Sequence, residues 1–257
     1  MRQSFRLAGF LMASLASLGS SFAADFTVDQ VRAALAKSSL EHPADFTGKD
    51  LSDLDLSNVD FKRANLAGAN LFASKLVGAN LSGANLAGAT LNSAWLMATN
   101  FRGANLSKCS ILGPVVLGGQ VKERPNFAGA NLSGARIIAD FPATDFSGAN
   151  LAGARMQVEI KNQGMGQMRN ELTGANFSGA NLADADLGRA VMNFTNLINA
   201  DLRGAKLFAV NLSGADLTGA DVTGADFTEA NLAGTLLKGS KGMAHAKGLD
   251  KAKNWDQ

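Results

Sequence analysis

The chain has 257 residues, with 24 Lys and Arg against 22 Asp and Glu, so its formal net charge is only +2. This balance argues against a strongly basic surface for nucleic acid. The single cysteine, Cys109, cannot form an internal disulfide, and His42 and His245 alone are too few for a histidine-based zinc site or catalytic triad.

Residues 1–23 have the pattern of a secretory signal peptide. Arg2 and Arg6 precede a short apolar stretch, which ends in a small-x-small cleavage sequence. We expect cleavage after Ala23 or Ala24 and a periplasmic or secreted mature protein. A single membrane anchor is the weaker alternative, because the apolar run is too short for a full span. The mature chain is therefore expected to have no transmembrane segment, and loss of the two arginines leaves 22 basic and 22 acidic residues.

Residues 24–43 are predicted to form a short capping helix. Thr27 and Gln30 have the spacing of a capping box, in which each residue satisfies a free backbone N–H of the first turn. Val31 and Leu35 would share one apolar face of this helix. We place the helix over the N-terminal end of the repeat that follows.

Residues 44–237 follow a five-residue repeat. An apolar residue returns at every fifth position, and Ala stands two residues before it in 23 of 35 units, as in residues 84–88. A period of five fits neither a helix nor a strand. Within one unit, the Ala and the apolar centre point the same way on an extended segment, and the small residues that follow suit a turn. The units fall in four blocks, with centres at 46–111, 127–137, 141–156 and 172–237.

These units are similar to those of pentapeptide repeat proteins, and the chain resembles that family over residues 44–237. The resemblance implies an all-β solenoid: a right-handed quadrilateral (four-sided) β-helix with one unit per side and short helical caps at its ends. Because the 35 units would then make about nine coils, a spacing of ~4.8 Å between coils predicts a rod on the order of 40 Å long.

Two stretches interrupt the repeat. Residues 112–126 are interpreted as an irregular coil. Val116 and Val121 keep the five-residue spacing from Ile111, and one extra residue is then inserted before the next apolar centre, Phe127. Residues 157–171 are predicted to form a protruding loop. Loops on a rigid scaffold often carry function, although a tolerated insertion is an equal alternative. The candidate functional residues of this loop are Lys161, Met165, Met168 and Arg169.

Residues 238–257 are predicted to form a C-terminal cap. Leu249 and Trp255 would pack against the last coil, whereas the lysines of this segment would form a solvated face.

An apolar stripe interrupts the otherwise polar outward positions. On a 20-residue coil, one outward column would hold a lysine and two apolar residues, and its neighbour would hold three apolar residues. Contiguous exposed apolar patches usually mark contact sites. The alternative is internal cover by residues 118–126 or 161–170. The candidate contact residues are Lys75, Trp95 and Val115 in one column, and Val77, Met97 and Leu117 in the next.

No spacing in the chain matches a catalytic, cofactor-binding or metal-binding motif. The sequence therefore predicts a non-enzymatic structural or protein-interaction scaffold, with a protein partner or a homodimer and no nucleic acid. The family resemblance offers one alternative, since some members mimic duplex DNA and bind a type II topoisomerase. Export and a neutral charge disfavour this role. An enzyme that uses Glu159, Lys161 and Arg169 of the 157–171 loop is a further alternative.

Overall fold

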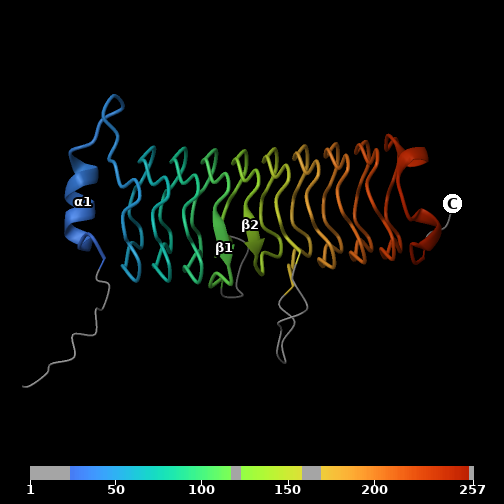
Figure 1. Ribbon diagram of the computed structural model, residues 1–257, viewed down its shortest axis with the longest axis horizontal. Coiled ribbons are helices and arrows are strands. Elements are labelled where there is room, and N and C mark those ends of the chain that lie inside the picture. The colour runs from blue at the N-terminus through green and yellow to red at the C-terminus, as the bar shows by residue number, and fades with distance from the viewer. Residues whose placement is uncertain (1–23, 117–122, 158–168, 255–257) are drawn as a thin grey trace, which may run out of the picture.

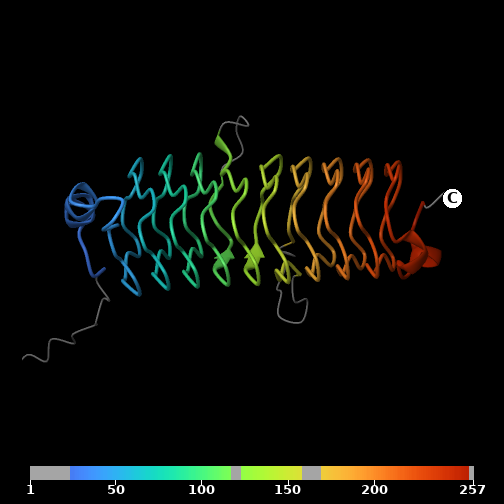
Figure 2. The ribbon, with the colours of Figure 1, turned by 90° about the horizontal axis from the view of Figure 1, so that it is seen from above.

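The computed structural model describes residues 24–116, 123–157 and 169–254. The expected signal peptide therefore lies outside the described residues. The described chain winds into coils that stack along one axis, with the helix α1 at the N-terminal end and the C-terminus at the other (Figure 1). The view turned by 90° shows the same single row of coils (Figure 2). No helix in the described ranges is long and apolar enough to cross a membrane.

Each five-residue unit forms one side of a coil and one corner. In a representative unit, the N–H of Leu66 donates to the carbonyl of Asn85 in the next coil (2.6 Å), and the N–H of Ala69 closes a turn onto the carbonyl of Leu66 (3.0 Å). Gly68 occupies the corner with a φ of +65°, which a glycine adopts without strain. The Leu and Ala side chains are buried, so the coil encloses a narrow apolar core.

Parallel bridges join successive coils in four columns. The residue before each apolar centre pairs with its counterpart one coil later, as Asp50 does with Asn70, 20 positions on. We number the columns in chain order, so that columns 1 to 4 begin at Asp45, Asp50, Asp55 and Asp60.

The first interruption is longer than the sequence indicated. Asn105 pairs with Asn131, so this coil spans 26 positions rather than 20. Phe127, and not Val121, takes the core place next to Phe101, with the two rings stacked at 4.9 Å. The expectation of one extra residue was wrong, because the ring stack fixes a register that the five-residue frame alone does not. Beside this excursion, strands β1 (Ser110–Leu112) and β2 (Arg136–Ile138) pair in parallel.

The second interruption comes after a coil that is one residue shorter than the regular 20. Asn131 and Asn150, in column 1, are 19 positions apart, because the core centres Ile137 and Phe141 are four residues apart rather than five. In the following coil Asp145 and Asn176 are 31 positions apart. The added residues of this coil include 158–168, which lie outside the described residues.

At the N-terminal end, α1 occupies Val28–Ala36, which is shorter than the 24–43 segment assigned to it. Both hydrogen bonds of the predicted capping box are present between Thr27 and Gln30. Phe26 packs edge-on against Phe46 of the first coil at 5.5 Å, and Val31 of α1 is buried. The helix ends early because Lys37 and Ser38 turn back onto carbonyls of its last turn.

At the C-terminal end, the chain keeps bridging beyond the five-residue frame. Lys241, Lys247 and Lys253 pair with the preceding coil, and between them lie the short 3₁₀ helices η3 (Met243–His245) and η4 (Leu249–Lys251). The spacing of six residues was not expected. Leu249 packs against the core as predicted, whereas Trp255 lies outside the described residues.

Candidate contact surface

Column 3 brings three residues of the predicted stripe together. Bridges join Lys75 to Trp95 and Trp95 to Val115. The ammonium of Lys75 lies 5.9 Å from the centre of the Trp95 ring and 3.6 Å from the carboxylate of Asp55. Trp95 and Val115 are half-buried and Lys75 is exposed. Column 3 thus holds a partly exposed aromatic side chain on a regular backbone.

The neighbouring positions of the stripe lie on the corner after column 3. Val77 and Met97 are half-buried there, and Leu117 lies outside the described residues. We call column 3 and the corners on its two sides face 3. Whether face 3 binds a partner stays a prediction, because no partner is present.

Face 3 carries apolar side chains that the sequence reasoning missed. Phe72 is 46% exposed and Phe194 is 67% exposed, both on corners that border column 3. Val191 is half-buried in the column itself, and Phe208 lies under the guanidinium of Arg189 at 5.1 Å. The three phenylalanines could have been found in the sequence, because each stands at one of the two turn positions of its unit, where most units have small or polar residues.

Column 1, on the opposite side of the coil, is polar and internally satisfied. The amide of Asn85 donates to the side-chain oxygen of Asn65 (2.9 Å), and Asn105 donates in turn to Asn85 (3.0 Å). The ladder continues through Asn131 and Asn150. Each side-chain oxygen also accepts a backbone N–H two residues on, as Asn85 does from Ala87. Because these amides already have partners, column 1 offers little to a binding protein.

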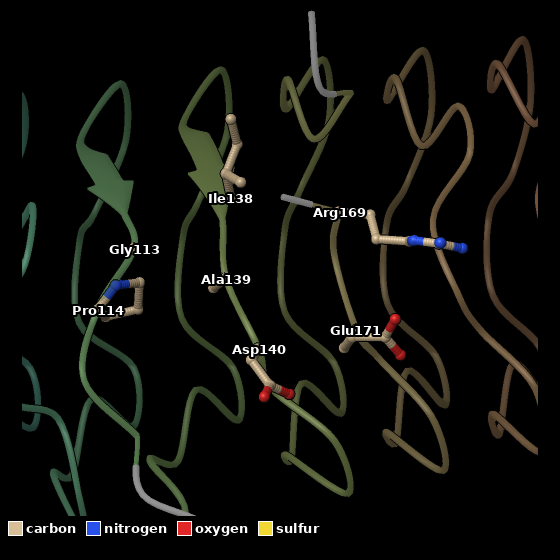
Figure 3. Close-up of a pocket in the computed structure, with 7 residues that line it drawn as sticks. All are labelled: Gly113, Pro114, Ile138, Ala139, Asp140, Arg169 and Glu171. Carbon is tan, nitrogen blue, oxygen red and sulfur yellow. The ribbon is translucent and has the colours of Figure 1, made fainter. Parts of the chain in front are cut away.

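A hollow of about 310 Å³ opens in the middle of face 3. The N–H of Gly113 bonds to the carbonyl of Ile138 (2.9 Å), but no bridge within the described chain joins Val115 to Asp140 in the next coil. The ladder of column 3 is thus interrupted between Val115 and Asp140 within the described residues. Figure 3 shows the strands of this region side by side; the hollow is lined by Gly113, Pro114, Ile138, Ala139, Asp140, Arg169 and Glu171.

Charged groups of both signs line the hollow. Burial raises the pKa of the Glu171 carboxyl; nearby Arg169 lowers this pKa and Asp140 raises it further. Asp140 and Glu171 occupy successive places in column 3, so their carboxylates lie on adjacent strands (Figure 3). Within the described residues, no third acidic or histidine side chain joins this pair. Across the described ranges, no three His, Cys, Asp or Glu side chains gather as metal ligands.

Asn170 stabilises the coil where the 157–171 segment rejoins it. Its side-chain oxygen accepts the N–H of Ala139 (2.8 Å), and its amide donates to the carbonyls of Ile137 (3.0 Å) and Met156. The side chain is buried, although it falls in the 157–171 segment that the sequence predicts to be a protruding loop. For Asn170 this prediction was wrong, and the sequence carried the signal: Asn170 stands two residues before Leu172, in the place of the inward Ala.

The other candidate residues of this loop stay untested. Arg169 is exposed at the edge of the hollow, whereas Lys161, Met165 and Met168 lie outside the described residues. Cys109 is buried in the core, and burial raises the pKa of its thiol to about 12. A thiol with so high a pKa is a core side chain rather than a nucleophile.

Four columns of parallel bridges, with one five-residue unit per side, define a quadrilateral parallel β-helix. A family model described as pentapeptide repeats matches eight copies in this chain, over residues 44–76, 64–103, 74–111, 171–207 and 205–241. The matched segments cover more than half of the sequence, so the chain belongs to the pentapeptide repeat family. The family predicted from the sequence is confirmed. Membership of this family implies that the β-helix is right-handed.

Solved pentapeptide repeat proteins are similar to this chain. HetL, involved in heterocyst differentiation regulation in the cyanobacterium Nostoc, is 24% identical with a TM-score of 0.40, over 88% of this chain and 96% of HetL. A pentapeptide repeat protein from the Arabidopsis thaliana thylakoid lumen is 33% identical with a TM-score of 0.27, over 46% of this chain and 69% of the Arabidopsis chain. QnrB1, a plasmid-mediated fluoroquinolone resistance protein, is 18% identical with a TM-score of 0.28, over 73% of this chain and 89% of QnrB1. These TM-scores carry no argument about function. Among curated proteins no match was found.

Proposed function

We propose that this chain is exported and acts outside the cytoplasm as a non-enzymatic scaffold that binds protein through face 3. The scaffold is a rod of about nine coils, closed at its ends by residues 24–43 and 238–257. Export is supported by the charged and apolar pattern of residues 1–23. The non-enzymatic role is supported by the family and by the chemistry of the described side chains.

The observation that carries the proposal is the uneven distribution of outward apolar side chains. Phe72, Trp95, Met97, Val191 and Phe194 share face 3, although they come from three coils, the second, third and seventh of the rod. Exposed aromatic residues held on a rigid backbone are typical of interface anchors, because little side-chain entropy is lost on binding. Large apolar side chains gathered on one face of a protein often mark a contact site.

The direct test compares Trp95→Asp with Ala87→Asp in the exported protein. Trp95 points outward and is half-buried, so Trp95→Asp is expected to keep the fold and lose a captured protein partner. Ala87 is also half-buried, on the corner after column 1 in the same turn, so Ala87→Asp adds the same charge away from face 3. Circular dichroism and affinity capture from periplasmic and membrane extracts are the measurements.

Three results would count against the proposal. An exported form that keeps residues 1–23 would contradict cleavage. Equal capture by both variants would remove face 3 as the binding surface. Unfolding by Trp95→Asp would make Trp95 part of the core instead.

A further inference from the structure

We propose that the C-terminal end of the rod binds an anionic phospholipid surface. Figure 1 shows the C-terminal coil at the end of the rod away from α1. The inference goes beyond the proposed function and does not depend on face 3, which runs along the side of the rod. The lysines that carry it are together called the basic end: Lys238, Lys241, Lys247, Lys251 and Lys253.

The two ends of the rod carry opposite charge. Residues 24–63, which form α1 and the first coil, hold eight acidic against five basic residues. Residues 238–257 hold five lysines against two aspartates, and this count includes Asp256, which lies outside the described residues. The ladder shows the same asymmetry, because all four columns begin with Asp, whereas columns 1 to 3 end with Lys. The excess of positive charge therefore lies at the C-terminal end.

The lysines of the basic end are accessible to an anion. All five are exposed, and within the part of the chain that the structure describes no ion pair joins them to a carboxylate. Asp221 and Asp226 hold the places before Lys241 and Lys247 in columns 1 and 2. Each carboxylate accepts a hydrogen bond of 2.6 Å from the hydroxyl of the threonine two residues on, which holds it against its own corner. These aspartates lie one coil step, ~4.8 Å, further from the end, so they offset only part of the lysine charge.

Apolar side chains lie among these lysines. Leu236 is 56% exposed and holds the last place of column 4, where every earlier place is Asn or Asp. Leu237, Met243 and Leu249 of the last coil pack against the core but stay half-buried. Exposed apolar residues surrounded by lysines are typical of proteins that lie on a membrane surface, where the apolar groups enter the headgroup region and the cations meet the lipid phosphates.

A planar surface fits the arrangement of the lysines better than a single acidic segment does. Lys241, Lys247 and Lys253 hold three successive columns and therefore leave three different sides of the coil. An acidic peptide would reach only one of these sides, whereas the phosphates of a bilayer lie in one plane across the end of the rod. Each lysine near an anionic membrane strengthens binding roughly five-fold, and an inserted apolar side chain supplies the second signal that stable attachment needs.

Cosedimentation of the purified exported protein with lipid vesicles tests the inference. Vesicles of equal parts phosphatidylglycerol and phosphatidylcholine supply the anionic surface, and vesicles of phosphatidylcholine alone supply the neutral one. At ~0.1 M NaCl, the protein is expected to bind the anionic vesicles only. The variant with Lys247→Glu and Lys253→Glu reverses two charges of the basic end, so it should bind at least ~10-fold more weakly.

The matched control carries Arg102→Glu and Lys108→Glu, which make the same change of charge at two exposed residues nearer the middle of the rod. Six coil steps, about 29 Å at ~4.8 Å each, separate the corner of Lys108 from Lys247. Because this distance exceeds the screening length of ~10 Å, the control should bind vesicles like the wild type. Leu236→Asn, which restores a polar residue in column 4, should weaken binding about three-fold or more. Circular dichroism checks that each variant keeps the fold.

Absence of wild-type binding to the anionic vesicles would overturn the inference, and so would equal binding by the two double variants. Self-association that depends on Lys247 and Lys253, in place of vesicle binding, would make an acidic protein surface the occupant and would also overturn it. Trp95→Asp should bind vesicles like the wild type. Loss of vesicle binding and loss of partner capture through face 3 are therefore separate results, and either proposal can fail without the other.

Discussion

Replacing Asn170 with Ala is expected to lower the free energy of unfolding by about 3 kcal/mol. The result is counterintuitive, because Ala is the usual residue at this place in the repeat. The Asn170 side chain satisfies the N–H of Ala139 and the carbonyls of Ile137 and Met156. Each buried backbone group left without a partner costs about 1–3 kcal/mol, and water that enters from the nearby hollow offsets part of the sum. Urea unfolding followed by circular dichroism measures the change.

Thr195→Ala is the matched control for this substitution. Thr195 also takes the place of an inward Ala, and its hydroxyl donates to the Met192 carbonyl (2.7 Å). That carbonyl keeps a backbone partner after the change, because the N–H of residue 195 also reaches it (3.3 Å). A loss of less than about 1 kcal/mol is therefore expected. Equal losses for the two variants would show that Asn170 does not hold the coil together.

Phe146→Ala is expected to cost about 3–5 kcal/mol, the usual range for a fully buried phenylalanine. Phe146 lies in the middle of a continuous ring stack, 5.0 Å from Phe127 and 4.8 Å from Phe177. Its removal leaves a cavity that the rigid coils on both sides cannot fill. Phe146→Leu, which restores the common residue of the repeat, should cost less than half as much.

The free energy of unfolding lost on a Phe→Ala substitution should depend on where along the rod the phenylalanine lies. Phe227 is also buried, but it lies near the C-terminal end. Because a solenoid is stabilised by contacts between neighbouring coils, the end can unfold locally and limit the cost of Phe227→Ala. Hydrogen exchange should show local opening for Phe227→Ala and a loss across many coils for Phe146→Ala. The reverse pattern would contradict a nearest-neighbour description.

The regular part of the fold could be predicted because its determinants are local and repeated. One Ala and one apolar centre per unit place both side chains inside, and a 20-residue coil then stacks Lys75 on Asp55 and Trp95 on Lys75. The capping box of α1 was equally readable, since Thr27 and Gln30 lie within one helical turn.

The irregular part could not be predicted, because it depends on contacts between distant residues. The five-residue frame puts Val121 20 positions after Phe101, and only the stack of Phe127 on Phe101 shows that Phe127 takes this core place. The place of Asn170 two residues before Leu172 marks it as an inward residue, but the carbonyls of Ile137 and Met156 to which it donates become evident only in three dimensions.

The contact surface was predicted in part for the same reason. The column with Trp95 followed from the coil length, whereas Phe72 and Phe194 occupy turn positions whose orientation the repeat does not specify.

The central claim is that face 3 is covered by protein in the native setting. Hydroxyl-radical footprinting tests it most directly, by comparing oxidation of the purified protein at high dilution with oxidation in intact periplasm. The account predicts protection of Phe72, Trp95, Met97 and Phe194, while Phe26, which packs at the N-terminal end, reacts equally in both samples. Equal oxidation of all these side chains in the two samples would contradict it, because face 3 would then be open to water where the protein works.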